Sequence, residues 1–233
     1  MPTLSCKIAS VEAITNTIYR VRLTPESYVV FRAGQYLTLK IKDHAHLSFS
    51  IASTPMEKDV IELHIGGTEL NSSIISAIEY IQNNKKIIVD MPHGRAWLRE
   101  EDDFPLILIA GGTGFSYIRS ILFTALARKS DRCISVYWGG REIQHLYELN
   151  SLNKLLLEYS HLKIFPVLER PTYGFCGREG TVISAVMKDY SFLYGHAIYI
   201  AGPVNMVKKA YICLCAERGA NSSLIFGDAL AFI

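Results

Sequence analysis

Hydrophobic and polar residues alternate with a period of two through most of the first hundred positions. The segments 19–23 (YRVRL) and 61–65 (IELHI) show this alternation most clearly. It is typical of strands with one buried face, and turn sequences such as Gly66-Gly67 and Pro92-His93-Gly94 separate the segments. The pattern predicts a closed or sandwiched antiparallel sheet. Over 71–82, isoleucines recur at helical spacing and predict one helix that plugs the end of a barrel.

Beyond Phe104-Pro105 the pattern changes to continuous apolar runs that alternate with amphipathic stretches. The runs are LILIA, CISVYW, LKIFPVL, AIYIA and SLIFG. Strands without a polar face, interleaved with helices, are typical of a parallel sheet covered on both sides. The predicted helices span residues 117–128, 144–159, 181–190 and 205–218. We expect a domain boundary near 99–105, with an antiparallel domain over 1–100 and an α/β domain over 104–233.

Composition and charge exclude several classes of function. The 233 residues are 49% hydrophobic and 20% charged, with a formal net charge of +2. No basic block gives a case for nucleic acid binding, and no run approaches the roughly 18 apolar residues needed to span a bilayer. The sequence starts without an apolar segment of the secretory type, so we expect a cytoplasmic protein that does not bind membranes.

Cysteine usage favours reduced thiols over disulfide bonds or a metal site. The chain has five widely scattered cysteines, which is an odd number. Cys213 and Cys215 form a C-x-C pair, but no second pair completes the four ligands that a zinc ion or an iron-sulfur cluster usually needs. We therefore predict no metal site.

A glycine-rich turn follows the first apolar run of the second half, in the segment LILIAGGTGFSY (106–117). Gly111, Gly112 and Gly114 permit a tight turn and allow backbone N–H groups to approach a phosphate closely. The helix predicted to follow directs its positive end to the same place. The spacing departs from both G-x-G-x-x-G and the P-loop, so a turn without a ligand is the alternative interpretation.

Two further glycine turns favour a nucleotide site over a turn without a ligand. WGGR (138–141) follows the second apolar run and AGP (201–203) follows the fourth. Three strand ends therefore carry glycine at the edge where doubly wound sheets bind ligands. Arg141 and Glu142 come together where a conventional NAD site has one acidic residue, which predicts weak selection between NADH and NADPH.

In the first half, the stretch HLSFSIASTP (46–55) carries four hydroxyls within seven positions. Alternation puts Ser48 and Ser50 on one face of a strand and the residues between and after them toward the core. A half-buried strand alone accounts for that alternation. Ser53 and Thr54 break it, and so leave hydroxyls and backbone groups free at a strand end for a ligand.

Eight motifs in a fixed order run along the chain: AGQYL (33–37), FSIASTP (49–55), IELHIG (61–66), MPHGRAWLR (91–99), LIAGGTGFSY (108–117), YWGGRE (137–142), AGP (201–203) and FGDALAFI (226–233). The series resembles the ferredoxin-NADP reductase superfamily, and most closely the bacterial NAD(P)H:flavin oxidoreductases that reduce free flavins. The resemblance implies a six-stranded antiparallel β-barrel that binds flavin. A Rossmann-like α/β domain with a parallel sheet, which binds the pyridine nucleotide, is implied to follow it.

The resemblance also implies roles for individual residues, because in this family the flavin lies beneath an Arg-x-aromatic-Ser strand. Ser50 is the candidate catalytic hydroxyl, donating a hydrogen bond to flavin N5, where hydride from nicotinamide C4 arrives. The implied flavin site contains Phe49, Ser50, Ile51, Ala52, Ile65 and Gly66. The implied nucleotide site contains Gly111, Gly112, Thr113, Gly114, Phe115, Ser116, Gly202 and Pro203, with Ala201 beside the last two in the nicotinamide pocket.

Two positions depart from the family's pattern. Leu47 stands where the motif has an arginine, whose fork suits flavin phosphate or ribityl oxygens, and leucine offers no donor. This departure predicts either weaker flavin binding or a replacement donor among Lys42, His44 and His46. Ala201 stands where many relatives have cysteine, and we interpret it as the mark of a subfamily.

Other conspicuous residues have simpler interpretations. Trp97 and Trp138 are interpreted as packing residues, and His64 as a satisfied polar residue on a strand. Hydride transfer between nicotinamide and flavin needs no strong general base. No histidine is therefore assigned a catalytic role.

The resemblance predicts a reductase that takes hydride from NADH or NADPH and gives it to riboflavin, FMN or FAD. The flavin is expected to be an exchangeable substrate, and after release it can reduce ferric complexes and other acceptors by diffusion. We expect a monomer whose partners are small molecules. One alternative is an electron-transfer subunit with tightly bound FAD and a protein partner, although no C-x4-C-x2-C cluster motif is present. The other is a binding module without turnover, which Leu47 makes conceivable.

Overall fold

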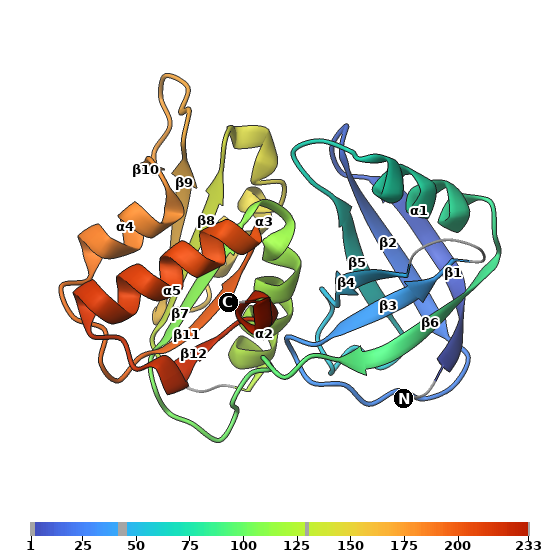
Figure 1. Ribbon diagram of the computed structural model, residues 1–233, viewed down its shortest axis with the longest axis horizontal. Coiled ribbons are helices and arrows are strands. Elements are labelled where there is room, and N and C mark those ends of the chain that lie inside the picture. The colour runs from blue at the N-terminus through green and yellow to red at the C-terminus, as the bar shows by residue number, and fades with distance from the viewer. Residues whose placement is uncertain (1–2, 42–45, 129–130, 233) are drawn as a thin grey trace.

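Two sheets, connected by the segment 94–105, make up the protein (Figure 1). The computed structural model describes residues 3–41, 46–128 and 131–232. The first sheet contains the antiparallel strands β1 (Thr3–Ala13), β2 (Ile18–Pro25), β3 (Tyr36–Lys40), β4 (Leu47–Ser50), β5 (Ile61–Gly66) and β6 (Lys86–His93). Their order is β4-β3-β6-β1-β2-β5. A bridge between Ile51 and Leu63 joins the two edges and closes the barrel that the sequence predicts.

The alternating pattern of the first half produces this barrel. On β2, the side chains of Val21 and Leu23 are fully buried between partly exposed arginines. Helix α1 (Ser72–Gln82) begins after Asn71, whose side chain accepts a hydrogen bond from the Ile74 N–H. Ala77, Ile78 and Ile81 of α1 belong to the barrel core, as expected of a helix that covers the barrel.

Strand β5 is more deeply buried than its alternating sequence predicts. All residues from Ile61 to Ile65 are buried, including Glu62 and His64, which the alternation places on the solvent side. The cause is tertiary, because the second domain covers the polar face of this strand. Buried charged groups are costly unless they are paired, so these two side chains require partners.

The second sheet is parallel throughout, with the order β10-β9-β8-β7-β11-β12. Its strands are β7 (Leu106–Gly111), β8 (Ile134–Gly140), β9 (Leu162–Leu168), β10 (Arg178–Glu179), β11 (Ala197–Ala201) and β12 (Ile225–Phe226). Helices α2 (Phe115–Ala127) and α3 (Leu149–Leu155) pack on one face, and α4 (Val182–Asp189) and α5 (Val204–Arg218) on the other. Helices therefore cover both faces of the sheet, as predicted.

The helix predicted over 144–159 is only partly present. A 3-10 turn spans Ile143–His145, the backbone of Leu146 leaves the helical region (φ −98°, ψ 57°), and α3 begins three residues later. His145, in the 3-10 turn, and Glu148, the residue before α3, are both buried. The short strand β10 was not predicted, because two residues carry no periodic pattern.

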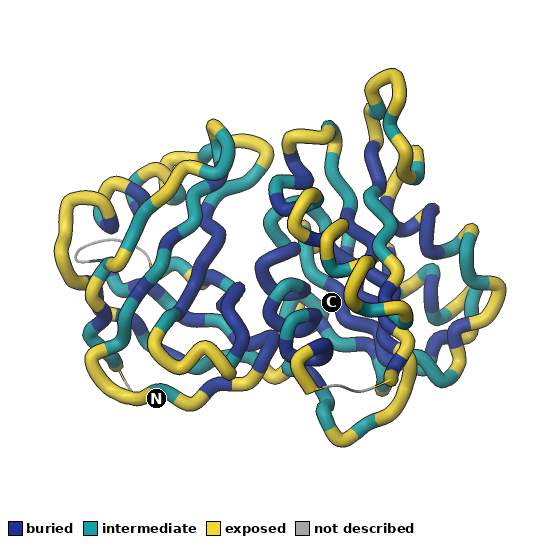
Figure 2. Tube along the Cα trace, turned by 180° about the vertical axis from the view of Figure 1, so that it is seen from behind, coloured by how far each residue is buried: buried dark blue, intermediate teal, exposed yellow. Residues whose placement is uncertain are grey.

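Helix α2 stands between the parallel sheet and the barrel (Figure 1). Viewed from behind, the segments on both sides of this join are mostly buried or half-buried, and the exposed residues concentrate in the outer loops (Figure 2). Among the described residues, no helix combines the length and apolar character needed to cross a membrane.

Candidate functional site

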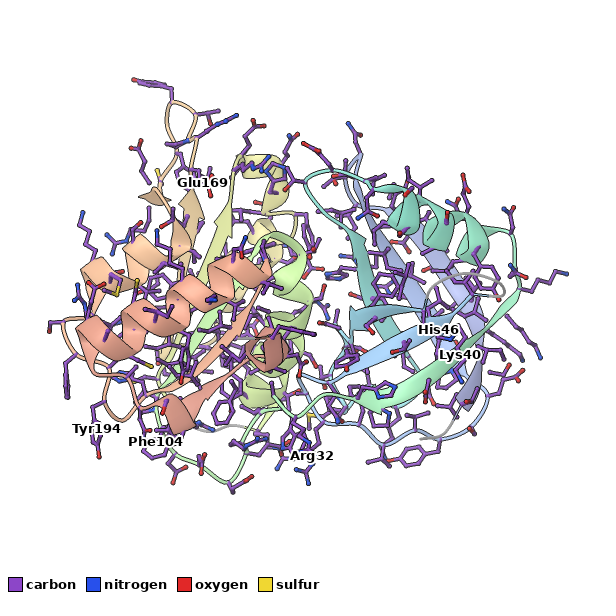
Figure 3. All side chains as sticks on the ribbon, in the orientation of Figure 1. Arg32, Lys40, His46, Phe104, Glu169 and Tyr194 are labelled. Atoms are coloured by element: carbon purple, nitrogen blue, oxygen red, sulfur yellow. The ribbon has the colours of Figure 1, made fainter. Side chains whose placement is uncertain are left out.

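A cavity of about 810 Å³, here called the first chamber, lies between the barrel and the carboxyl edge of the parallel sheet. Glu169 lies at this edge, at the end of β9, opposite the edge that carries Phe104 and Tyr194 (Figure 3). Ligands bind at this edge in doubly wound sheets, and the volume is typical of a small-molecule site. The lining includes the predicted residues Phe49, Ser50, Gly66, Gly111, Gly112, Thr113, Gly114, Ser116, Gly202 and Pro203, together with Ala201.

Four other predicted residues do not line this chamber. Ile51, Ala52, Ile65 and Phe115 are fully buried. Phe115 stacks on the ring of Trp138, with ring centroids 3.8 Å apart. These side chains lie behind the lining, so the structure gives them a supporting position and no exposed surface for a ligand.

Strand β4 presents Ser48 and Ser50 to the first chamber and turns Phe49 into the barrel core. The Ser48 and Thr38 hydroxyls lie 3.1 Å apart and share a hydrogen bond. The Ser50 hydroxyl has no hydrogen-bond partner within the described part of the chain. It is half-buried, so it is free to donate to a group in the chamber.

Leu47 points to the same side of β4 as Phe49 and packs against the barrel core, without lining the chamber. Of the three candidate replacement donors, His46 is exposed and does not line the chamber either. Lys42 and His44 lie outside the described residues. Among the described candidates, the structure therefore offers no substitute for the missing arginine.

The hydroxyls of Ser53 and Thr54 are engaged within the protein, so the prediction that they are free for a ligand is wrong. Ser53 Oγ accepts the Glu62 N–H at 3.0 Å, and its carbonyl accepts the Ser120 hydroxyl at 2.7 Å. Thr54 Oγ1 accepts the Met56 N–H at 2.9 Å. These bonds close the barrel, dock the second domain and form a tight turn.

The glycines of the β7 and β11 turns allow the two turns to approach each other closely. A Cβ atom at Gly114 would lie 2.4 Å from the Ala201 carbonyl oxygen, and one at Gly111 would lie 2.6 Å from Met206 Sδ. Gly112 has φ +55°, and a Cβ there would meet no atom within 4 Å. The α2 N-terminus has no side-chain cap at Gly114. A helix N-terminus without a side-chain cap, beside open space at Gly112, fits a phosphate of a dinucleotide.

A second chamber of about 770 Å³ adjoins the first one. Its walls are formed by Tyr36, the segment 93–96 and the segment 225–232. Both chambers are lined by Ser48, Ser50, Asp228 and Ala229. Ser50 therefore lies at the border of two connected spaces, one of which faces the glycine turns.

Comparison with known proteins agrees with this geometry. Residues 108–211 match the family model described as the oxidoreductase NAD-binding domain. The chain is 40% identical to the NAD(P)H-flavin reductase of Aliivibrio fischeri, with 99% of each chain covered. It is 38% identical to the NAD(P)H-flavin reductase of Vibrio harveyi, covering 99% of this chain and 100% of that protein. The chain belongs to the NAD(P)H-flavin reductase family.

The fold of this flavin reductase family member is also found in solved structures. The crystal structure of the Amycolatopsis cytochrome P450 reductase GcoB superposes with a TM-score of 0.88 and 26% sequence identity. The superposition covers 97% of this chain and 69% of that chain. The barrel and the parallel sheet therefore have the same relative arrangement in both proteins.

Asp228 is a chamber residue that the sequence interpretation missed. Burial raises the pKa of its carboxyl, although hydrogen bonds from the Arg95 and Ala96 backbone N–H groups act in the opposite direction. The only sequence signal is its place in the motif FGDALAFI. The sequence pattern does not predict that residue 228 lies beside the barrel, because this position depends on the path of the chain after β12.

The two charged residues after β8 have separate roles in this flavin reductase family member. Arg141 is exposed and lines the first chamber. Glu142 instead caps the following 3-10 turn, and its own N–H donates to His145 Nδ1 at 3.0 Å. Glu169 and Lys209 also line the chamber. Charges of both signs therefore face this end, which is compatible with weak selection between the two nucleotides.

A buried polar cluster joins β2 and β5 of the barrel to α2 and to the residue preceding α3. Glu148 accepts hydrogen bonds from Arg20 Nη2 at 2.6 Å and from Arg119 Nε at 3.0 Å. Glu62 accepts from Arg22 Nε at 2.9 Å. The carboxylates that the barrel and the second domain bury are thus paired with arginines from both domains.

Glu62, His64 and Glu148 each offer a possible metal ligand atom within 4.8 Å of the others. The arginines already neutralise both carboxylates, and the Glu62 carboxylate and His64 Nε2 are 3.0 Å apart. Bringing a further cation between them would break these bonds and place it against arginine charge. We interpret the cluster as an ion-pair network.

Acid is expected to weaken this network through Glu62. Burial is the largest influence on its pKa and acts to raise it, but the His64 hydrogen bond, Arg119 and Arg22 together lower the pKa from 4.5 to about 2. A lowered folded-state pKa stabilises the protein above pH 4.5, and this stabilisation is lost as the pH falls toward 2. At about 1.4 kcal/mol per pKa unit it amounts to roughly 3 kcal/mol.

The free energy of unfolding of wild type and Glu62→Gln, measured in urea from pH 7 to pH 2, tests this expectation. The gap between the two proteins should narrow below pH 4.5 and nearly close at pH 2. Glu158→Gln, which changes an exposed carboxyl without an ion pair among the described residues, is the control and should follow wild type. A constant gap across the whole pH range would contradict the assignment.

Proposed function

We propose that the protein transfers hydride from NADH or NADPH to a free flavin, which binds as a substrate and leaves after reduction. Membership of the NAD(P)H-flavin reductase family supports this activity. The observation that carries the site is the unpartnered Ser50 hydroxyl at the border of the two chambers. The glycine turns lie in the same chamber, so one cavity offers both a phosphate cradle and a donor for a reacting atom.

The residues divide between the two substrates. The face of β4 that carries Ser48 and Ser50 is proposed to hold the isoalloxazine ring, with Phe49 anchoring the strand in the core. The segments 111–116 and 201–203 are proposed to hold the nucleotide, through backbone N–H groups at the phosphates and a wall beside the nicotinamide. Bound nicotinamide supplies the hydride, and bound flavin accepts it at N5.

Ser50 is proposed to stabilise the charge that develops on the flavin ring during hydride transfer. Its hydroxyl donates one hydrogen bond to N5, and the bond strengthens as N5 gains electron density. Because the Ser50 side chain makes no hydrogen bond to the residues that the structure describes, the donor needs no rearrangement before reaction. The flanking Ser48 hydroxyl already shares its hydrogen bond with Thr38.

The position of Leu47 supports a flavin that exchanges readily. A side chain that packs on the barrel core supplies no ion pair to a flavin phosphate. Leu47→Arg is therefore expected to give no gain in FMN affinity, and to lower stability by about 1 kcal/mol or more, because a charge replaces an apolar contact. FMN fluorescence titration and urea unfolding measure the two effects. An affinity gain of tenfold would show that an arginine at this position reaches the flavin.

Several broader proposals concern the setting of the reaction. Both chambers are built within one chain, which supports a monomer that is complete without a partner. Five free thiols fit a reducing compartment such as the cytoplasm. Released reduced flavin is then available to ferric complexes and other flavin-dependent acceptors by diffusion.

One assay tests the activity against its alternatives. NADH and NADPH oxidation is followed with added riboflavin, FMN or FAD, on protein whose bound flavin has been quantified by absorbance. Colourless protein with flavin-dependent oxidation supports the proposal. Stoichiometric tightly bound flavin would instead indicate an electron-transfer subunit, and oxidation at background with saturating flavin would indicate a binding module. A ferric complex added to the same assay tests whether its reduction requires free flavin.

A further inference from the structure

Helix α2 is fastened to the barrel along one polar side. Thr113 Oγ1 donates to the Gly66 carbonyl at 3.3 Å, Arg119 Nη1 to the Ala52 carbonyl at 2.8 Å, and Ser120 Oγ to the Ser53 carbonyl at 2.7 Å. Thr113 lies in the 3-10 turn Gly112–Gly114 directly before α2, and Arg119 and Ser120 lie in the second turn of α2. The acceptors follow or end the strands β4 and β5. The helix that begins at the nucleotide turn is thus tied to the strand ends beside Ser50.

One hydrogen bond between two side chains also crosses this join, at the wall of the first chamber. His64 on β5 lines the chamber, and its Nδ1 lies 2.9 Å from the hydroxyl of Tyr147. Tyr147 also contacts the first turn of α2, because its ring packs edge-to-face on Phe115 and its hydroxyl interacts with the Ser116 side chain. Ser116 itself lines the chamber. Tyr147 therefore links the barrel to the nucleotide turn, in addition to the Thr113–Gly66 bond.

Both ends of this link are held rigidly. The Tyr147 ring packs edge-to-face on Trp138, with centroids 5.1 Å apart, and on Phe115. Burial, followed by the charge of Glu148, raises the pKa of Tyr147, so its hydroxyl remains protonated and able to hydrogen-bond. On the other side, His64 Nε2 lies 3.0 Å from Glu62 Oε1.

Charged groups from several elements surround His64. Glu148 Oε1 lies 3.7 Å from its Nε2, and the arginines that pair with both carboxylates come from β2 and α2. The imidazole is thus fixed in the middle of an ion-pair network that spans both domains. Within the described residues, its Nδ1 has one hydrogen-bond partner, the Tyr147 hydroxyl. The ion-pair network around His64 is thereby connected, through the His64–Tyr147 hydrogen bond, to the residue that contacts the nucleotide turn.

We propose that the His64–Tyr147 hydrogen bond positions the nucleotide turn of α2 against the flavin-binding barrel, and so sets the approach of nicotinamide C4 to flavin N5. The proposal rests on the proposed function, since it concerns the same two substrates. Hydride transfer needs the reacting atoms at roughly 3–3.5 Å, and a misplacement of about 1 Å from a distant change can cost about 100-fold. His64 and Tyr147 are positioning residues in this scheme, because they act through the turn.

Tyr147→Phe tests the proposal because it removes the hydroxyl and keeps the ring that packs on Trp138. The turnover number is measured with NADH and with NADH deuterated at both C4 positions, at saturating FMN. The expected result is a turnover number about tenfold lower, together with a larger deuterium isotope effect, because hydride transfer becomes the slower step. The KM for FMN is expected to change less than twofold.

Tyr190→Phe is the matched control. Its hydroxyl donates to Ser135 Oγ at 3.0 Å in the same domain, and neither residue lines a chamber. The control loses a similar part-buried hydrogen bond, so it should lose similar stability and keep the wild-type turnover number and isotope effect. Thermal unfolding of both variants separates loss of stability from loss of position.

The outcomes distinguish the failure of this inference from the failure of the proposed function. If wild type shows no flavin-dependent NADH or NADPH oxidation, the proposed function fails. If wild type is active and Tyr147→Phe keeps its turnover number and isotope effect, the positioning role is overturned, whatever happens to stability. Should Tyr147→Phe fold poorly, His64→Gln removes the same hydrogen bond from the barrel side and keeps an amide nitrogen to face Glu62, and a shift of the same kind is expected. No shift there overturns the inference equally.

Discussion

Replacing Ser50 with alanine is expected to lower kcat/KM for flavin reduction by roughly 30- to 1,000-fold, the equivalent of about 2–4 kcal/mol. The hydroxyl has no partner of its own within the described residues, so its loss leaves no protein group unpaired. The fold should therefore be unaffected, and the whole effect should fall on the reaction. Steady-state kinetics with NADH and FMN measures the effect on the reaction rate, and FMN titration by fluorescence quenching measures the effect on FMN affinity.

Ser48→Ala is the comparison variant for this experiment. Ser48 stands two residues away on the same face of β4, but its hydroxyl is already engaged with Thr38. We expect Ser48→Ala to lose less than threefold in kcat/KM. If Ser50→Ala also retains activity within threefold, the Ser50 hydroxyl is not the donor to N5, and the flavin ring must be bound elsewhere in the two chambers.

Gly114→Ala is expected to raise the KM for NADH or NADPH by about 10- to 100-fold. The added Cβ would lie 2.4 Å from the Ala201 carbonyl oxygen. The backbone fixes the position of both atoms, so no side-chain rotation can relieve the contact. Gly114 has an ordinary backbone conformation (φ −55°), so crowding is the whole cause. Relieving it separates the turns after β7 and β11, at a cost of about 1–3 kcal/mol, and distorts the phosphate cradle.

The measurement is the KM for nucleotide at saturating FMN, accompanied by the Kd for FMN, which should stay near the wild-type value. Gly174→Ala is the control, because its added Cβ meets no atom within 4 Å and the residue lines neither chamber. Its positive φ costs some stability without reaching the cradle. An unchanged nucleotide KM in Gly114→Ala would argue against the nucleotide crossing this turn.

Local sequence patterns were sufficient to predict the strands and the glycine turns that surround the site. A period of two predicts the barrel strands, continuous apolar runs predict the parallel sheet, and both patterns reflect which faces are buried. The glycine turns were recognisable because close approach of backbone requires glycine whatever the surroundings. The hydroxyl of Ser50 was assigned through the family motif, and its free state follows from the structure.

Tertiary contacts explain what the sequence could not predict. Glu62 and His64 read as the solvent face of a strand, and become buried only because arginines and a tyrosine from other elements pair with them. Ser53 and Thr54 read as free hydroxyls, but the barrel closure and a tight turn use them. Asp228 reaches the border of the chambers from the far end of the chain. The periodic pattern of hydrophobic and polar residues does not show which distant residues form these contacts.

The join between α2 and the barrel also bears on how such enzymes diversify. Thr113, Arg119 and Ser120 donate to backbone carbonyls of the barrel, and every residue type offers the same carbonyl. The docking bonds therefore depend on the path of the barrel backbone, which Gly66 and the Ser53 hydroxyl hold in place, and side chains elsewhere on the barrel can change without altering these bonds. Selection for a new flavin can act on one domain while the other keeps its place.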